Sequence, residues 1–77
     1  MSPASEQALA ALRRVARGHA GASSGELAAW DILQNLAEGR PVDFGSCLVR
    51  LDDTGRHAVA TLVIDLATGK TSLSELG

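Results

Sequence analysis

Cys47 and His57 are the residues of this chain whose types could supply a nucleophile and a general base, and they lie on either side of a predicted turn. Thiol catalysis requires the imidazole within hydrogen-bond reach of the sulfur, in a cleft that admits a substrate. A cysteine that is buried behaves instead as a small hydrophobic residue. Because this pair is the sole indication of catalysis in the sequence, we predict that the protein is not an enzyme and has no catalytic residue.

Metal and phosphate sites are also not expected. His19, Cys47 and His57 lack the paired short spacings of a zinc site. The triplet Gly69-Lys70-Thr71 is similar to the end of a phosphate-binding loop, but Ile64 occupies a position at which that loop requires a glycine. We therefore predict no metal and no cofactor.

Arg13, Arg14 and Arg17 are predicted to form a basic patch at the end of the first helix. Such a patch could contact nucleic-acid phosphates or an acidic protein surface, although cations also stabilise the negative end of any helix. A helix-turn-helix over residues 5–38 would have a recognition helix without Arg or Lys. The net charge of −2 provides no general attraction to nucleic acid. A small DNA-binding regulator that uses this patch is therefore the alternative function, and nucleic acid is not the expected partner.

Leu27 and Trp30 are the residues most suited to bind another protein. A helical wheel over the second predicted helix places Leu27 within the polar stripe and Trp30 at its border. An exposed tryptophan next to an exposed leucine is typical of the anchors that concentrate binding energy at interfaces. We predict a partner-binding surface made of Leu27, Trp30, Asp31 and Gln34. The competing interpretation is that the segment 40–47 folds back and covers the two apolar side chains.

Two helices are predicted in the first half of the chain. The first covers about residues 3–17, with Ser2 as its N-cap and a proline at its first position. Ser23 and Glu26 form a capping box in front of an apolar segment, which places the start of the second helix there. This helix is expected to end near Glu38, since a glycine and a proline follow.

The second half of the chain fits two structures, of which the first is a small sheet. Residues 58–66 alternate between the two faces of a strand. Turn-like sequences at 53–55 and 67–70 could close a three-stranded antiparallel meander over residues 47–74.

The second structure is a helix over residues 53–66. Asp52 or Asp53 would cap its start, and Ser72 with Glu75 would form another capping box near the end of the chain. The side chains that this helix would turn toward a core are Ala58, Val59, Leu62, Val63 and Leu66.

Size and composition predict one small domain over residues 1–77. Hydrophobic residues make up 45% and charged residues 21% of the 77, so the chain is expected to fold. With one cysteine and no apolar run long enough to cross a bilayer, we expect a cytoplasmic protein without a membrane partner. We predict an all-α fold, a compact bundle of three to five short helices in which the first two form an antiparallel hairpin. The alternative is an α+β fold with two helices packed on the meander.

Four short sequences follow the Ala/Leu-rich first helix in this order: Gly21-Ala22-Ser23, Asp43-Phe44, Leu51-Asp52 and Ile64-Asp65-Leu66. In this arrangement the chain resembles a family of small uncharacterised proteins carried on integrative and conjugative elements and plasmids of proteobacteria. The resemblance implies a helical final segment and a mobile genetic element as the setting, and small anti-CRISPR proteins share this style of compact acidic domain. We therefore expect a non-enzymatic interaction module that self-associates or binds a host protein complex, including as an inhibitor of host defence.

Overall fold

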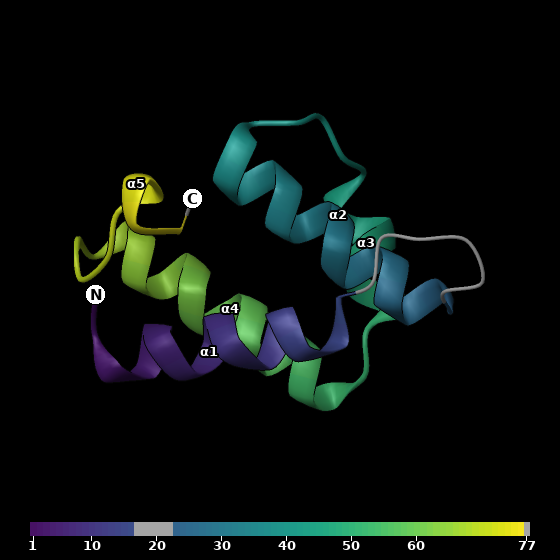
Figure 1. The fold of residues 1–77 in the computed structure, drawn as a ribbon, viewed down its shortest axis with the longest axis horizontal. Helices are drawn as coiled ribbons and strands as arrows, with labels where there is room; N and C mark the ends of the chain where they lie inside the picture. Colours follow the sequence, from purple (N-terminus) through teal and green to yellow (C-terminus); the bar gives the residue numbers. More distant parts are fainter. Residues whose placement is uncertain (17–22, 77) are drawn as a thin grey trace.

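Helices α1 (Pro3–Val15) and α4 (Asp53–Ala67) lie side by side and run in opposite directions (Figure 1). They belong to a computed structural model that describes residues 1–16 and 23–76. Helix α1 packs more extensively against α4 than against α2. The α1–α4 pair therefore makes the most extensive helix contact, and α1 also packs against α2, its neighbour in the predicted hairpin.

Three further helices complete the bundle. Helix α2 (Ser24–Glu38) packs against α1 and against α3 (Phe44–Arg50), and α5 (Leu73–Leu76) packs against α2. The described part of the chain contains no strand. The predicted all-α bundle is therefore confirmed, and the alternative meander over residues 47–74 is wrong, because most of this segment is helical.

Side-chain caps set the start of four of these helices. Each cap accepts a hydrogen bond from the backbone N–H three residues later, at 2.8–3.2 Å, and the caps are Ser2, Ser23, Asp43 and Asp52. The predicted caps Ser2, Ser23 and Asp52 are confirmed. Asp43 opens α3, a helix that the sequence pattern does not predict. Helix α1 ends at Val15 instead of residue 17, and residues 17–22 lie outside the described part.

Two glycines end the longer helices. Gly39 follows α2 and Gly69 follows α4, with φ angles of 73° and 79°. These angles lie in the left-handed region, which glycine adopts without the steric penalty of a Cβ atom. The predicted end of the second helix at Glu38 is confirmed.

One cluster of buried side chains forms the core. Leu12, Ile32 and Leu62 are fully buried and come from α1, α2 and α4, respectively. Cys47 of α3 joins the same cluster. The radius of gyration is 11.5 Å, close to the value of about 11.5 Å that a compact chain of this length should have.

The inner face of α4 differs from the predicted one at Val63. Ala58, Val59 and Leu62 are buried as expected and Leu66 is half-buried, but 42% of Val63 is exposed. Val63 is displaced by 100° from Leu62 around the helix. Because Leu62 points directly into the core, Val63 lies at the edge of the buried face.

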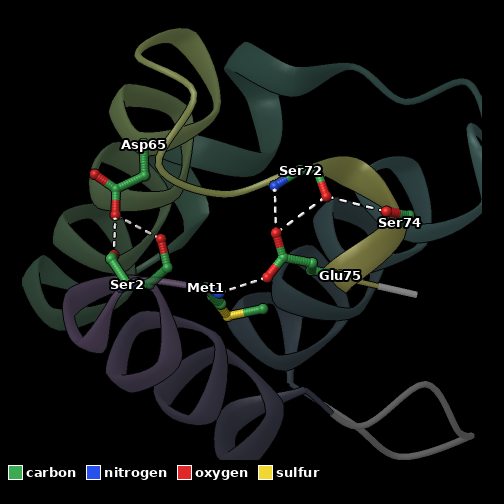
Figure 2. Close-up of polar contacts among 7 residues, drawn as sticks. Met1, Ser2, Asp65, Ser72, Ser74 and Glu75 are labelled. Atoms are coloured by element: carbon green, nitrogen blue, oxygen red, sulfur yellow. Dashed lines mark hydrogen bonds and ion pairs between the residues drawn. The ribbon is translucent and has the colours of Figure 1, made fainter.

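Helix α5 is fixed to the beginning of the chain by a network of polar contacts (Figure 2). Glu75 Oε1 accepts a hydrogen bond from the backbone N–H of Ser72 at 3.1 Å, as predicted for the second capping box. Glu75 Oε2 lies 2.5 Å from the amino group of Met1. Hydrogen bonding and the charge of Glu75 raise the pKa of this amino group, and the same contact lowers the pKa of Glu75. Leu76 is buried in the core behind these contacts.

Candidate interaction surface

The surface predicted on α2 is partly open to solvent. Leu27 and Trp30 lie on adjacent turns and are 36% and 38% exposed, so more than a third of each stays accessible. Asp31 and Gln34 beside them are half-buried. Trp30 and Gln34 line a depression of about 260 Å³. The structure thus groups these residues on α2, and their role in binding stays a prediction.

The predicted basic patch is mixed with acidic side chains. Arg13 and Arg14 are exposed on α1, whereas Arg17 lies outside the described residues. The two arginines line a hollow of about 570 Å³ together with Glu6 and Glu75. A phosphate that entered this hollow would meet the carboxylates of Glu6 and Glu75 and the amino group of Met1 as well as the two guanidinium groups. The hollow is therefore of mixed charge and not the purely basic surface that is typical of phosphate contacts.

Cys47 and His57 have separate partners. Cys47 is buried, and its sulfur accepts a hydrogen bond from Arg50 Nη2 at 3.3 Å. His57 is exposed near the start of α4, and its Nδ1 lies 2.9 Å from the carbonyl oxygen of Asp53. Because a buried thiol has no access to a substrate, this arrangement offers no nucleophile.

The second half of α4 has an unusual distribution of charge. Between Ala58 and Ala67 the helix contains one charged residue, Asp65. This carboxylate is buried on the side of α4 that faces α1. A helix at a protein surface normally carries its charges on the solvent side. In this segment the arrangement is reversed, and the solvent side has no charge.

Two serines of the α1 region hold the buried carboxylate. Asp65 Oδ2 accepts hydrogen bonds from Ser2 Oγ and Ser5 Oγ, each at 2.5 Å (Figure 2). The hydrogen bonds from Ser2 and Ser5 lower the pKa of Asp65, and the positive charge of Lys70 adds to this effect, while burial opposes it. The carboxylate also lies at the positive end of α1, which stabilises its negative charge. Asp65 therefore lies on the same side of α4 as the buried Ala58, Val59 and Leu62.

The opposite side of α4 exposes small and branched apolar residues. We call this side the outer face of α4, and it consists of Ala60, Val63, Ile64 and Ala67. Their spacing of three, four and seven residues is that of one apolar stripe on a helix. Ile64 is 58% exposed. The hydroxyls of Thr61 and Thr68 beside this stripe each donate a hydrogen bond back to a carbonyl oxygen four residues earlier, that of His57 and that of Ile64, at 2.9 Å.

A groove runs between this stripe and α3. We call it the α3–α4 groove; its volume is about 470 Å³ and its lining residues are Phe44, Leu48, Val49, Arg56, Val59, Ala60, Val63 and Ile64. Val49 forms its most open edge and is 70% exposed. Arg56 is the one charged residue in this lining. Apolar side chains with a single charged group are the usual lining of a binding groove.

Arg56 also joins α3 to α4. Its Nε and Nη2 donate hydrogen bonds to the carbonyl oxygens of Leu48 and Val49, at 3.1 and 3.0 Å. These carbonyls belong to the last turn of α3, where a cation is electrostatically favoured. Nη1 lies 3.8 Å from Asp53 Oδ1. Arg56 thus holds the two walls of the groove at a fixed separation.

This groove was not predicted from the sequence, although the sequence contains one signal for it. The ten residues from Ala58 to Ala67 contain a single charge, which is too few for a helix with a solvated side. The alternation that fits a strand arises because apolar residues lie on both sides of this helix. The contribution of α3 had no comparable signal, since a helix of seven residues has almost no periodicity to detect.

The described residues show neither a metal site nor a membrane-spanning helix. Within residues 1–16 and 23–76, no group of three or more His, Cys, Asp or Glu side chains is placed to hold a metal ion. None of the described helices is both long and apolar enough to cross a membrane. Comparison of the chain with protein-family models, with curated proteins and with solved structures yields no match. The resemblance to small proteins of mobile elements therefore stays a prediction.

Proposed function

We propose that this protein is a non-enzymatic interaction module that binds a protein partner through the α3–α4 groove and the outer face of α4. The observation that carries this proposal is the position of Asp65, the single charge of the last ten residues of α4, which is buried against α1. The solvent side of these turns is left without charge, although surface helices are normally polar on that side. Covering this face with another protein removes apolar area from water.

The shape of the surface supports an elongated partner. The groove follows α4 from Arg56 to Ile64, about two turns of helix. Grooves of this kind bind the apolar stripe of an amphipathic helix. Alanines at positions 60 and 67 allow the backbone of such a helix to approach closely. The proposed partner segment is therefore helical.

The biological setting follows from the resemblance to proteins of integrative and conjugative elements. In that setting the module acts in the cytoplasm and binds a host protein complex, with inhibition of host defence as the proposed outcome. The Leu27 and Trp30 surface is the second candidate for the contact. It is less favoured, because about two thirds of each side chain is already covered within the chain.

The alternative of a small DNA-binding regulator has weaker support. It depends on Arg13, Arg14 and Arg17, and the first two share their hollow with Glu6 and Glu75. A gel-shift assay on generic duplex DNA at low salt tests it directly. A shift that added salt abolishes would favour this alternative, since phosphate contacts release counterions.

Site-specific photocrosslinking tests the proposed function. A photoreactive amino acid replaces Val49 at the edge of the groove, Trp30 on the other surface, or Thr54 as an exposed control outside both. In a proteobacterial cell extract we expect a crosslinked protein, identified by mass spectrometry, from position 49 and not from position 54. Unlabelled wild type should compete with this crosslink, and an Ile64→Glu variant should not.

Two outcomes contradict the proposal. Crosslinks from position 30 with none from position 49 would move the binding surface to Leu27 and Trp30. No specific crosslink from either position, including to a second copy of the chain, would show that neither surface binds a protein under these conditions and would reject the module.

A further inference from the structure

We infer that the occupant of the α3–α4 groove is a second copy of this chain, whose α4 lies antiparallel to the first in a symmetric dimer. This inference rests on the proposed function, because it names the partner of the same surface. It differs in its consequence, since the groove of each copy then binds α4 of the other copy and not a segment of a different protein.

A two-fold dimer requires a surface that is complementary to itself. In such an interface the same patch serves both copies, and each contact occurs twice. The outer face of α4 offers branched residues, Val63 and Ile64, and the groove beside it is an open apolar space of about 470 Å³. A small residue, Ala60, lies one turn before the branched pair. With the helices antiparallel, Ile64 of each copy lies opposite Ala60 of the other. The two-fold rotation that relates the copies then places α4 of each copy in the groove of the other.

The charges at the two ends of the stripe favour the antiparallel orientation. Arg56 lies at the end of the groove nearest the start of α4. The other end of the helix carries the partial negative charge of its last carbonyl groups, and Lys70 follows it with a positive charge that also acts on Asp65. In the antiparallel register that pairs Ile64 with Ala60, Lys70 lies opposite residue 54, next to Asp53 of the other copy, whereas a parallel partner would bring the two Arg56 guanidinium groups together. Between the two ends of α4, residues 58–67 carry no exposed charge that could repel a second copy.

The size of the surface predicts a weak dimer. Val49, Val63 and Ile64 are 70%, 42% and 58% exposed, so three aliphatic side chains provide most of the open apolar surface. Each partner of a standard stable complex contributes about 800 Å², which is more than these side chains supply. We therefore expect a weak and reversible monomer–dimer equilibrium.

Sedimentation equilibrium over a wide range of concentrations measures this dimer. The test variant is Val63→Glu, which places two like charges close to the two-fold axis. The matched control is Leu73→Glu, which adds the same charge at an exposed apolar residue of α5, outside the groove. We expect dimerisation to weaken at least tenfold in Val63→Glu and to change less than twofold in Leu73→Glu. Circular dichroism at low concentration verifies that both variants are folded.

Disulfide crosslinking tests the orientation. His57→Cys and Ala67→Cys, placed in separate copies of which one is isotopically labelled, are mixed and oxidised. The antiparallel dimer predicts the mixed 57–67 disulfide, whereas a parallel dimer predicts 57–57 and 67–67 pairs. Wild type is the control, because its buried Cys47 should form no intermolecular disulfide.

Three results would overturn the inference. One is a chain that stays monomeric up to about 1 mM, another is a dimer that Val63→Glu does not weaken, and the third is crosslinking in the parallel pattern alone. A monomer whose position 49 still crosslinks another protein would reject the second copy and leave the proposed function standing. A monomer without any such crosslink would reject both.

Discussion

The inner and outer faces of α4 have opposite relations to charge and solvent. The inner face contains Leu62, which is fully buried, and Asp65, whose carboxylate is bonded to Ser2 and Ser5. The outer face contains Val63 and Ile64, which are exposed. No charged residue lies on this side of the last turns of the helix. One helix thus supplies core contacts on one side and an exposed apolar surface on the other. Stability and binding should therefore be separable by substitutions at adjacent positions.

The largest expected effect comes from the inner face. Leu62→Ala removes buried methyl groups and leaves a cavity, which should lower the free energy of unfolding by about 2–5 kcal/mol. The matched substitution on the outer side, Val63→Ala, should cost less than about 1 kcal/mol, since much of Val63 already faces water. Urea unfolding followed by circular dichroism measures both. If both variants lose the same free energy of unfolding, the two faces do not differ in their contribution to stability.

Asp65→Asn should have the next largest effect. It keeps the size of the side chain but removes the charge that strengthens the hydrogen bonds from Ser2 and Ser5. We expect a lower unfolding midpoint at neutral pH, with a smaller loss than in Leu62→Ala because no cavity forms. If the midpoint instead increases, the desolvation of the carboxylate outweighs its hydrogen bonds, and the contact does not stabilise the inner face.

The same carboxylate predicts a pH dependence of stability. Its pKa in the folded chain lies below the ordinary value of 3.8, so the unfolded chain takes up the proton at a higher pH than the folded chain. The stabilisation is complete above the ordinary pKa, decreases as the pH falls through it, and is lost below the folded pKa. Glu75 contributes in the same direction from its ordinary value of 4.5. Unfolding midpoints from about pH 7 to about pH 3 should fall less steeply in Asp65→Asn than in wild type.

A smaller effect is expected where the two walls of the groove are joined. Arg56→Ala removes two hydrogen bonds to the carbonyl oxygens of Leu48 and Val49, both solvent-accessible. We expect a loss of about 0.5–1.5 kcal/mol in the free energy of unfolding. Amide hydrogen exchange should accelerate in α3 more than in α1, since α3 loses its link to α4. Uniform acceleration in both helices would show that Arg56 does not position the groove wall.

Local chemistry made the helix ends predictable. Ser2, Ser23, Asp52 and Gly39 act through hydrogen bonds or backbone angles within a few residues of the chain. Such contacts form in the same way whatever the rest of the fold does, so the sequence pattern is sufficient to locate them.

The direction in which α4 faces could not be predicted in this way. It depends on Asp65 meeting Ser2 and Ser5, which are 63 and 60 residues away in the sequence. A helical wheel groups Val63 with Leu62 because both are apolar, and only packing against α1 separates them. The groove was missed for the same reason, since its second wall, α3, is positioned by contacts with α2 and by Arg56.

The smallest effect on stability is expected on the outer face itself. Val63→Glu should change the free energy of unfolding by no more than about 0.5 kcal/mol at low micromolar concentration, because the new carboxylate can reach water. At high concentration wild type should gain stability by dimerisation and the variant should not, since association stabilises the folded state by mass action. Unfolding midpoints measured at both concentrations therefore separate the two roles of α4. A large loss at low concentration would mean that Val63 belongs to the core, and the outer face would then be part of the fold and no binding surface.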